Sequence, residues 1–261
     1  MSRPLFLPED PDGTEWDVAI VGAGMGGATL GYALARQGRR VLFLEKGRFL
    51  QRDPEVASGD LLDQGEVPEA RLRKGHWPLP LEGSTSFGEL DFFAPLGCGT
   101  GGSSALYAAT LERMLPADFR PRANFPEVED SSLPEAWPIT YQEFEPYYRR
   151  AERLFRVRGT PDPLNPTADG CLLEPPPLAE RDRCIQDLLV RRGLHPYRVH
   201  IGCELVEGCG GCGGVICQRG CKGDAGWMCL VPAVEQFGAR LLPQCEVSTL
   251  EADHSRVRTL R

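Results

Sequence analysis

The sequence has few basic residues for its length, and it contains no long apolar run. Lys and Arg number 29 against 37 Asp and Glu, which gives a formal net charge of −8. Nucleic acids and anionic membranes both require a basic face, so the charge argues against either partner. No stretch approaches the roughly 20 apolar residues of a membrane span. The start, MSRPLFLPEDPDGTEW, lacks the regions of a secretory signal, which predicts a cytoplasmic protein.

Glycine, proline and cysteine are abundant instead, with 30, 23 and 10 residues. Five cysteines fall within nineteen residues, in CELVEGCGGCGGVICQRGC from Cys203 to Cys221. Without an export signal most thiols should be reduced, so a disulfide framework is less favoured than a metal site or plain thiols. The other five are isolated and are predicted to be buried apolar residues: Cys98, Cys171, Cys184, Cys229 and Cys245.

The strongest motif is the first glycine loop, in EWDVAIVGAGMGGATLGYALARQGRRVLFLEKG. An apolar strand at 18–21 runs into a GxGxxG pattern, a helix follows at 28–36, and a second strand spans 41–44. This order is typical of a dinucleotide-binding fold, in which the glycines allow a tight turn, close approach of a pyrophosphate and close helix packing. Glu45 follows at the distance where a carboxylate accepts the ribose hydroxyls. The predicted cofactor-binding residues of this loop are Gly22, Gly24, Gly26, Gly27 and Glu45.

A second glycine loop follows in FGELDFFAPLGCGTGGSSALYAATLER, before a stretch that can be helical. Two such loops seventy-odd residues apart indicate a cofactor too long for one loop, although a tight turn before a helix would also explain the second. The predicted cofactor-binding residues of this loop are Gly97, Gly99, Gly101, Gly102, Ser103 and Ser104.

Together these motifs resemble the glucose–methanol–choline (GMC) oxidoreductase family. The resemblance rests on GAGMGG with Glu45, GCGTGGSS with Arg113, WPITYQEFEPYYRRAERLFRVRG, and GCKGDA followed by GARLLPQCEV. It implies an α/β fold with a Rossmann-like FAD-binding domain and a parallel sheet, interrupted by a mostly helical or irregular insertion. It also implies that Val247, on the late strand of GARLLPQCEVSTLEAD, contacts the adenine side of FAD. The family often has Asn and Gly where this chain has Tyr107 and Ala108.

The resemblance implies an FAD-dependent oxidoreductase that acts on the CH–OH group of an alcohol, with hydride passing to flavin N5. The family's histidine base lies in a C-terminal half, and none of His76, His195, His200 and His254 has a matching context, so the catalytic residues stay unknown. We expect an N-terminal fragment whose substrate-domain half is absent, with an electron acceptor or a second polypeptide as partner. The alternatives are a non-catalytic flavin- or metal-binding fragment and an NAD-dependent dehydrogenase.

The predicted organisation is a first part of the FAD-binding domain at 1–112, an inserted cap at 113–200, and a cysteine-rich loop with return to the FAD-binding domain at 201–261. Helices are predicted at 140–155, opened by a Thr140/Glu143 capping box, and at 181–192. Thiolates on glycine-rich loops suit an iron–sulfur cluster or zinc, and disulfides and unligated thiols stay open. The candidate metal ligands are Cys209, Cys212, Cys217 and Cys221.

Overall fold

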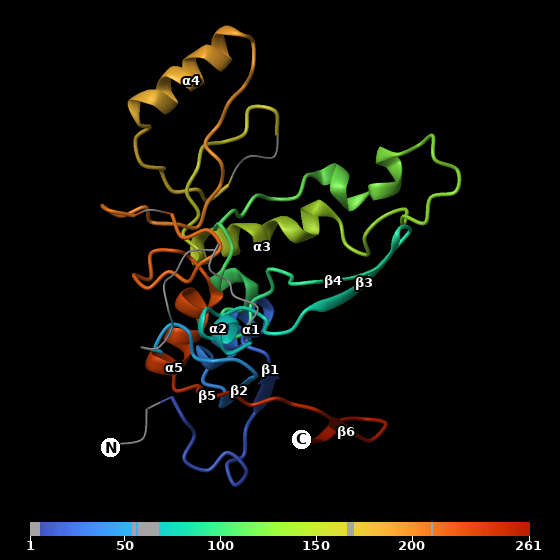
Figure 1. Ribbon diagram of the computed structural model, residues 1–261, viewed down its shortest axis with the longest axis vertical. Helices are drawn as coiled ribbons and strands as arrows, with labels where there is room; N and C mark the ends of the chain where they lie inside the picture. The colour runs from blue at the N-terminus through green and yellow to red at the C-terminus, as the bar shows by residue number, and fades with distance from the viewer. Residues whose placement is uncertain (1–5, 54–55, 57–67, 166–169, 210) are drawn as a thin grey trace. The chain divides into compact units, whose positions relative to one another are not determined.

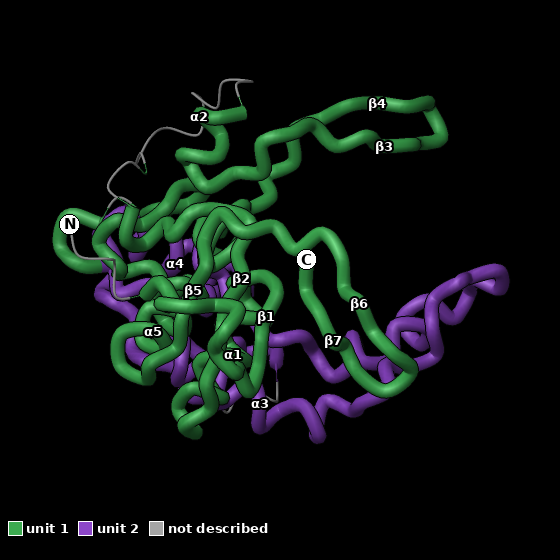
Figure 2. Tube along the Cα trace, turned by 90° about the horizontal axis from the view of Figure 1, so that it is seen from below, with its two compact units in different colours: residues 1–108, 206–261 green, residues 109–205 purple. Residues whose placement is uncertain are grey.

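The computed structural model describes residues 6–53, 56, 68–165, 170–209 and 211–261. The chain forms two compact units, shown in different colours in Figure 2. Unit 1 combines residues 1–108 with residues 206–261, and unit 2 consists of residues 109–205. Unit 1 is therefore discontinuous in sequence, and unit 2 is inserted into it.

A parallel sheet forms the centre of unit 1, with the strand order β1-β2-β5 (Figure 1). β1 spans Val18–Val21, β2 spans Val41–Glu45 and β5 spans Arg240–Pro243. Every residue of β2 is buried, because this strand lies between the other two. The apolar runs that predicted strands at 18–21 and 41–44 therefore form neighbouring parallel strands, and the predicted α/β Rossmann-like fold is confirmed.

Helices pack on this sheet at close range. α1 spans Met25–Ala35 between β1 and β2, and the chain leaves it through Gly38 at φ +80°. A Cβ atom at Gly31 would lie 2.1 Å from the Phe43 ring, so this glycine lets α1 sit against β2. A π-helical turn at Gly226–Leu230 leads into α5 at Val231–Phe237, directly before β5.

The rest of unit 1 includes elements that the sequence did not predict. α2 spans Pro68–Arg73 and follows residues 57–67, which lie outside the described residues. Two antiparallel hairpins pair β3 (Leu81–Thr85) with β4 (Gly88–Phe92), and β6 (Leu250–Ala252) with β7 (Val257–Leu260).

The stretch after the second glycine loop, which the sequence allows to be helical, forms only a 3-10 turn at Gly102–Ala105. The turn starts from Gly101 and Gly102, whose φ values of +86° and +55° lie in the left-handed region. Leu106 N–H and Tyr107 N–H both donate to the Ser103 carbonyl, and the chain then leaves helical geometry.

Unit 2 contains 3-10 turns at Pro116–Phe119 and Pro121–Asn124, and the helices α3 (Tyr141–Leu154) and α4 (Glu180–Arg191). The predicted capping box is confirmed, because Glu143 N–H donates to Thr140 Oγ1 and Thr140 N–H donates to the Glu143 carboxylate. Pro146 lies inside α3 without ending it.

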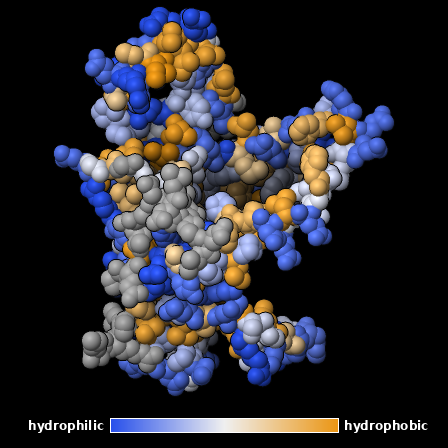
Figure 3. Space-filling model, in the orientation of Figure 1, coloured by the Kyte–Doolittle hydropathy of each residue, from blue (hydrophilic) through white to orange (hydrophobic). Residues whose placement is uncertain are grey.

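The aromatic residues of α3 recur at helical spacing and form a stripe that is only partly buried. Phe155 is buried, but Phe144 and Tyr148 are half-buried and Tyr147 is 57 % exposed. The stripe packs sideways on Phe119 of the first 3-10 turn, which leaves one side of it open. No residue of α4 is buried, and Figure 3 shows apolar surface over this helix, where Ile185, Leu188 and Val190 are all about half exposed.

Among the described residues, no helix is long and apolar enough to cross a bilayer.

Candidate functional site

The first glycine loop lies where β1 meets α1. The chain turns at Gly22, whose φ of +88° favours glycine, and the Gly22 N–H donates to the Leu44 carbonyl at 2.8 Å. Gly24 is the N-cap of α1 and offers no side chain to the free N–H groups of the first turn. A Cβ atom at Gly22 or Gly26 would meet no atom within 4 Å. The start of α1 therefore presents N–H donors and open space, which together suit a phosphate.

Glu45 fixes this loop to the end of β2. Its carboxylate accepts hydrogen bonds from Ala23 N–H and Gly47 N–H, both at 2.8 Å, and the residue is 7 % exposed. An ionised carboxylate has about four lone-pair positions, so two bonds leave capacity for hydroxyl donors. The predicted role in ribose binding is compatible with this position.

The second glycine loop lies directly against the first. Gly101 N–H donates to the Ala23 carbonyl at 2.8 Å, and a Cβ atom at Gly102 would lie 3.0 Å from the Gly24 Cα. Residues 97–104 also pair with the segment after β2, because Thr100 N–H donates to the Arg48 carbonyl. The structure thus brings the two predicted glycine loops together at one place in unit 1.

Within the second loop, most polar groups bond to the protein itself. Gly97 N–H donates to Ser103 Oγ at 3.0 Å. Ser104 is buried, and its hydroxyl donates to the Gly101 carbonyl and accepts from Ala225 N–H. These bonds hold the loop in shape, so Ser104 acts on a ligand only through the backbone that it supports.

Val247 does not lie on a strand, contrary to the prediction. β5 ends at Pro243, and Gln244 then adopts φ +55°. Gln244 N–H donates to the Gly47 carbonyl and Cys245 N–H to the Glu45 carbonyl, so the chain still follows the end of β2. Val247 comes two residues later, half-buried, between β5 and β6.

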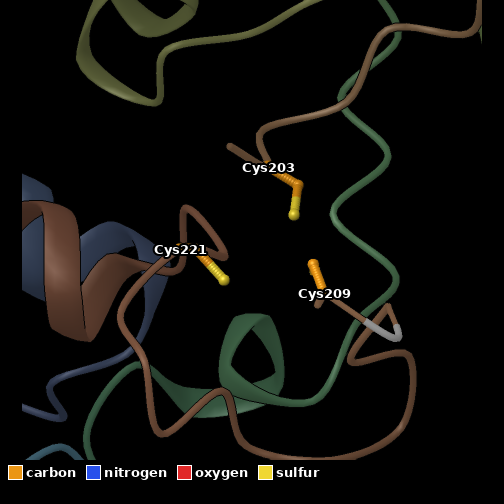
Figure 4. A group of neighbouring side chains, drawn as sticks. All are labelled: Cys203, Cys209 and Cys221. Atoms are coloured by element: carbon orange, nitrogen blue, oxygen red, sulfur yellow. The ribbon is translucent and has the colours of Figure 1, made fainter. Parts of the chain in front are cut away.

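Four of the clustered cysteines belong to unit 1 and come from one loop. The sulfur atoms of Cys217 and Cys221 are 3.4 Å apart, and both residues are buried. The sulfur atoms of Cys209 and Cys221 lie within 4.8 Å of each other (Figure 4). Cys203, which is also drawn there, belongs to unit 2. Cys212 is half-buried.

The loop favours a thiolate at Cys217. Burial alone would raise the pKa of this thiol, but hydrogen bonds from the backbone of Lys222, the Cys221 side chain and further backbone N–H groups lower it below the ordinary value. Burial, together with the nearby Cys217 sulfur, raises the pKa of Cys212. The Cys217 thiol therefore ionises more readily than an ordinary thiol, which suits a metal ligand.

The isolated cysteines are buried only in part. Cys98 and Cys229 are buried as predicted, whereas Cys171 and Cys245 are half-buried and Cys184 is exposed on α4. The prediction is wrong for Cys184 because α4 buries no side chain at all.

The histidines separate into two exposed and two buried residues. His195 and His254 are exposed. His76 is 2 % exposed and pairs through its backbone with Gly97, so it packs beside the second glycine loop, and burial lowers its pKa. In unit 2, the buried His200 faces the Glu112 carboxylate with Nδ1 at 2.8 Å.

Unit 2 also contains a small polar cavity of about 190 Å³. Arg113 and Glu152 line it and form a buried ion pair in which two guanidinium nitrogens donate to the two carboxylate oxygens. His200 and Tyr197 line it as well. Because these two charges are hydrogen-bonded to each other, we assign the pair a structural role: it holds the C-terminal part of α3, which carries Glu152, to Arg113.

Sequence reasoning missed two buried charged residues beside the cysteine-rich loop, Lys222 and Asp224, which are 2 % and 0 % exposed. Lys222 Nζ donates to the carbonyls of Tyr107, Cys212 and Val215. The available signal was GCKGDAG, in which two charges stand between glycines and next to a cysteine.

Comparison with known proteins gives one family match and several relatives. Residues 20–50 match an NAD(P)-binding Rossmann-like domain. The chain is 27 % identical over 254 residues to 6'''-hydroxyparomomycin C oxidase of Streptomyces lividus, covering 92 % of this chain and 43 % of that protein. It is 24 % identical over 266 residues to the fructose dehydrogenase large subunit of Gluconobacter japonicus, covering 91 % and 46 %.

Among solved structures, formate oxidase of Aspergillus oryzae, in a study of FAD modification, superimposes with a TM-score of 0.57 at 17 % identity. The match covers 96 % of this chain and 42 % of that one. This chain therefore spans less than half the length of these proteins.

Proposed function

Because the chain belongs to the glucose–methanol–choline oxidoreductases, whose N-terminal portion it matches, we propose that it binds FAD and forms part of an enzyme that oxidises the CH–OH group of an alcohol. The observation that supports this most strongly is the contact between the two glycine loops, where Gly101 N–H donates to the Ala23 carbonyl. A single loop would suit NAD equally well, whereas the joined pair offers an extended cradle for a longer dinucleotide.

The residues present fit this cofactor. A Cβ atom at Gly22 or Gly26 would meet nothing within 4 Å, so that side of the loop is open to a ligand. At Gly27 and Gly97, by contrast, a Cβ atom would lie 2.0 Å and 2.4 Å from backbone atoms of the protein. Gly22 and Gly26 therefore leave room for a ligand, whereas Gly27 and Gly97 allow backbone segments of the protein to pack closely.

Each part of this chain has a defined task in the proposed enzyme. The first turn of α1 and the loop at 22–27 bind the pyrophosphate, and Glu45 accepts the ribose hydroxyls. Residues 97–104 continue the cradle, and the segment around Val247 borders the adenine side. FAD, when bound, supplies the hydride acceptor. The alcohol-binding groups and the base would come from sequence that the longer relatives have, in the same polypeptide or in a second one.

We further propose that Cys209, Cys212, Cys217 and Cys221 hold an iron–sulfur cluster that serves an external electron acceptor. The support is the donor set itself, which is all sulfur, with Cys217 and Cys221 3.4 Å apart and Cys217 held by hydrogen bonds that favour the thiolate. Such bonds to cluster sulfurs are common in iron–sulfur proteins. Zinc would suit the same four thiolates.

The test is an absorption spectrum of the chain purified without oxygen, with FAD, NAD, iron, zinc and acid-labile sulfide assayed on the same sample. Flavin bands with one FAD per chain are expected, together with stoichiometric iron and sulfide. A colourless protein that also fails to take up added FAD contradicts the FAD proposal, and bound NAD would favour a nicotinamide-dependent enzyme. Zinc alone, or no metal, contradicts the cluster without affecting the FAD proposal.

A further inference from the structure

A carboxyl group lies sealed beneath the second glycine loop. Asp224 is completely buried, and its Oδ1 accepts hydrogen bonds from Gln51 Nε2 at 3.1 Å and from Trp227 N–H at 3.0 Å. Its Oδ2 is buried and has no hydrogen-bond partner among the described residues. A buried carboxylate oxygen without a partner is unfavourable, so this position requires an explanation beyond packing.

The carboxyl lies next to the point where the two glycine loops meet. A Cβ atom at Gly101 would lie 3.0 Å from Asp224 Oδ1, so the loop approaches the carboxyl this closely only because residue 101 is glycine. Gly101 N–H donates to the Ala23 carbonyl, and the following residue, Gly102, contacts Gly24 at the start of α1. Gly101 therefore lies between Asp224 and the first glycine loop, at the place where the two loops meet, which we call the crossing.

Neutral groups fix the orientation of this carboxyl. The Thr100 hydroxyl donates to Gln51 Oε1, which turns the Gln51 amide nitrogen toward Asp224. Leu50 N–H in turn donates to Thr100 Oγ1. The segments at 50–51 and 100–104, which pack against the carboxyl, contain no titratable side chain.

Two titratable groups face Asp224 from its own segment and from the turn that follows. Lys222 is close enough to favour the carboxylate, but its ammonium group is bonded to three backbone carbonyls. Burial raises the pKa of Cys229 to about 11, so this thiol is neutral at ordinary pH. Burial is the largest influence on Asp224 as well, and raises its pKa to about 6. A moderate further rise in this pKa would therefore protonate Asp224 at neutral pH.

We propose that binding of the dinucleotide at the place where the two glycine loops meet takes up one proton from solvent at the Asp224 carboxyl. The inference rests on the proposed function, since it requires FAD at the glycine loops. A pyrophosphate at the crossing places negative charge above the carboxyl, and a like charge disfavours the ionised form. The protonated form keeps both bonds to Oδ1 and removes the repulsion, so the bound state is the protonated state.

The experiment uses the full chain freed of flavin, with FAD titrated by calorimetry between pH 5.5 and 8.5 in two buffers of different ionisation enthalpy. The Kd for FAD should rise as the pH rises above 6, toward about tenfold per pH unit, and proton uptake at pH 7.5 should approach one per FAD. Asp224→Asn, which keeps the shape and is always neutral, should bind with nearly constant Kd and no uptake over the same range. Asp91→Asn, on the exposed strand β4, should behave as the unchanged protein does.

The outcomes separate this inference from the proposed function. Tight FAD binding without pH dependence or proton uptake in the unchanged protein overturns the role of Asp224 and leaves FAD binding intact. Undiminished uptake in Asp224→Asn also overturns it, because the proton would then go to another group. Failure to bind FAD at every pH overturns the proposed function itself. The measurement on the unchanged protein decides the matter even where the variant does not fold.

Discussion

The two adjacent glycines at the start of α1 give the sharpest test of how the first glycine loop is built. Gly26 and Gly27 both lie in the first turn of α1, but only one of them contacts the rest of the protein. A Cβ atom at Gly27 would lie 2.0 Å from the Gly22 carbonyl oxygen and 3.0 Å from Ile20 Cγ2, whereas one at Gly26 would meet nothing within 4 Å. Gly26→Ala and Gly27→Ala therefore make the same chemical change in different surroundings.

The expected difference follows from two opposing contributions. Alanine is favoured over glycine in a helix by up to ~1 kcal/mol, which should raise the free energy of unfolding of Gly26→Ala. At Gly27 the new methyl group meets a backbone oxygen that cannot rotate away, and overpacking of this kind is destabilising by about 1–3 kcal/mol. The two variants should thus differ by about 2–4 kcal/mol, or roughly 5–15 °C in melting temperature for a chain of this size.

Thermal unfolding of the FAD-free chain, followed by circular dichroism, measures this difference without involving the cofactor. Gly26→Ala should melt at or above the temperature of the unchanged protein, and Gly27→Ala clearly below it. Equal melting temperatures within about 2 °C, which for this size is about 1 kcal/mol or less, would refute the claim that Gly27 is present for close packing against the loop.

Two further changes test buried charges. Glu152→Gln should lower the free energy of unfolding by up to about 3–5 kcal/mol, because it removes the carboxylate that pairs with the buried Arg113 guanidinium through two hydrogen bonds and leaves Arg113 the longer ion pair with Glu145 at 3.3 Å. Urea denaturation measures this, with the exposed Glu127→Gln as control, and a loss below about 1 kcal/mol, typical of a surface pair, would contradict the buried-pair assignment. Lys222→Met should destabilise the cysteine-rich loop by about 2–4 kcal/mol, because three partly buried carbonyls lose their donor. Faster reaction of Cys217 and Cys221 with a thiol reagent is expected, and unchanged rates would show that Lys222 does not hold the loop closed.

The sequence was sufficient for the elements whose signals are local. The strands at 18–21 and 41–44 follow from short apolar runs, and the start of α3 follows from its Thr140/Glu143 capping box. In each case the residues that decide the structure are neighbours in sequence. The two glycine loops could be named for the same reason, although their contact could not be derived from spacing.

The remaining features depend on contacts between distant residues, which spacing does not report. Asp224 and Lys222 are charged, and charged residues are ordinarily exposed, so only the folded chain shows that Gln51 and three backbone carbonyls accompany them inside. Val247 was expected on the late strand of GARLLPQCEVSTLEAD, but Gln244 ends the regular pairing two residues after Leu242. The α3 aromatics have helical spacing, yet nothing in that spacing states how much of the stripe a partner element covers.

The discontinuity of unit 1 has a consequence for how the chain is made. β2 pairs with β5 through residues such as Glu45 and Pro243, about 200 positions apart, and all of unit 2 is encoded between them. At synthesis rates of about 5–20 residues per second, β5 would be synthesised roughly 10–40 s after β2. Throughout that interval an apolar strand edge stands unpaired on the nascent chain, while the contiguous unit 2 can already fold. Production of this protein should therefore depend on chaperone protection more than its size alone would suggest.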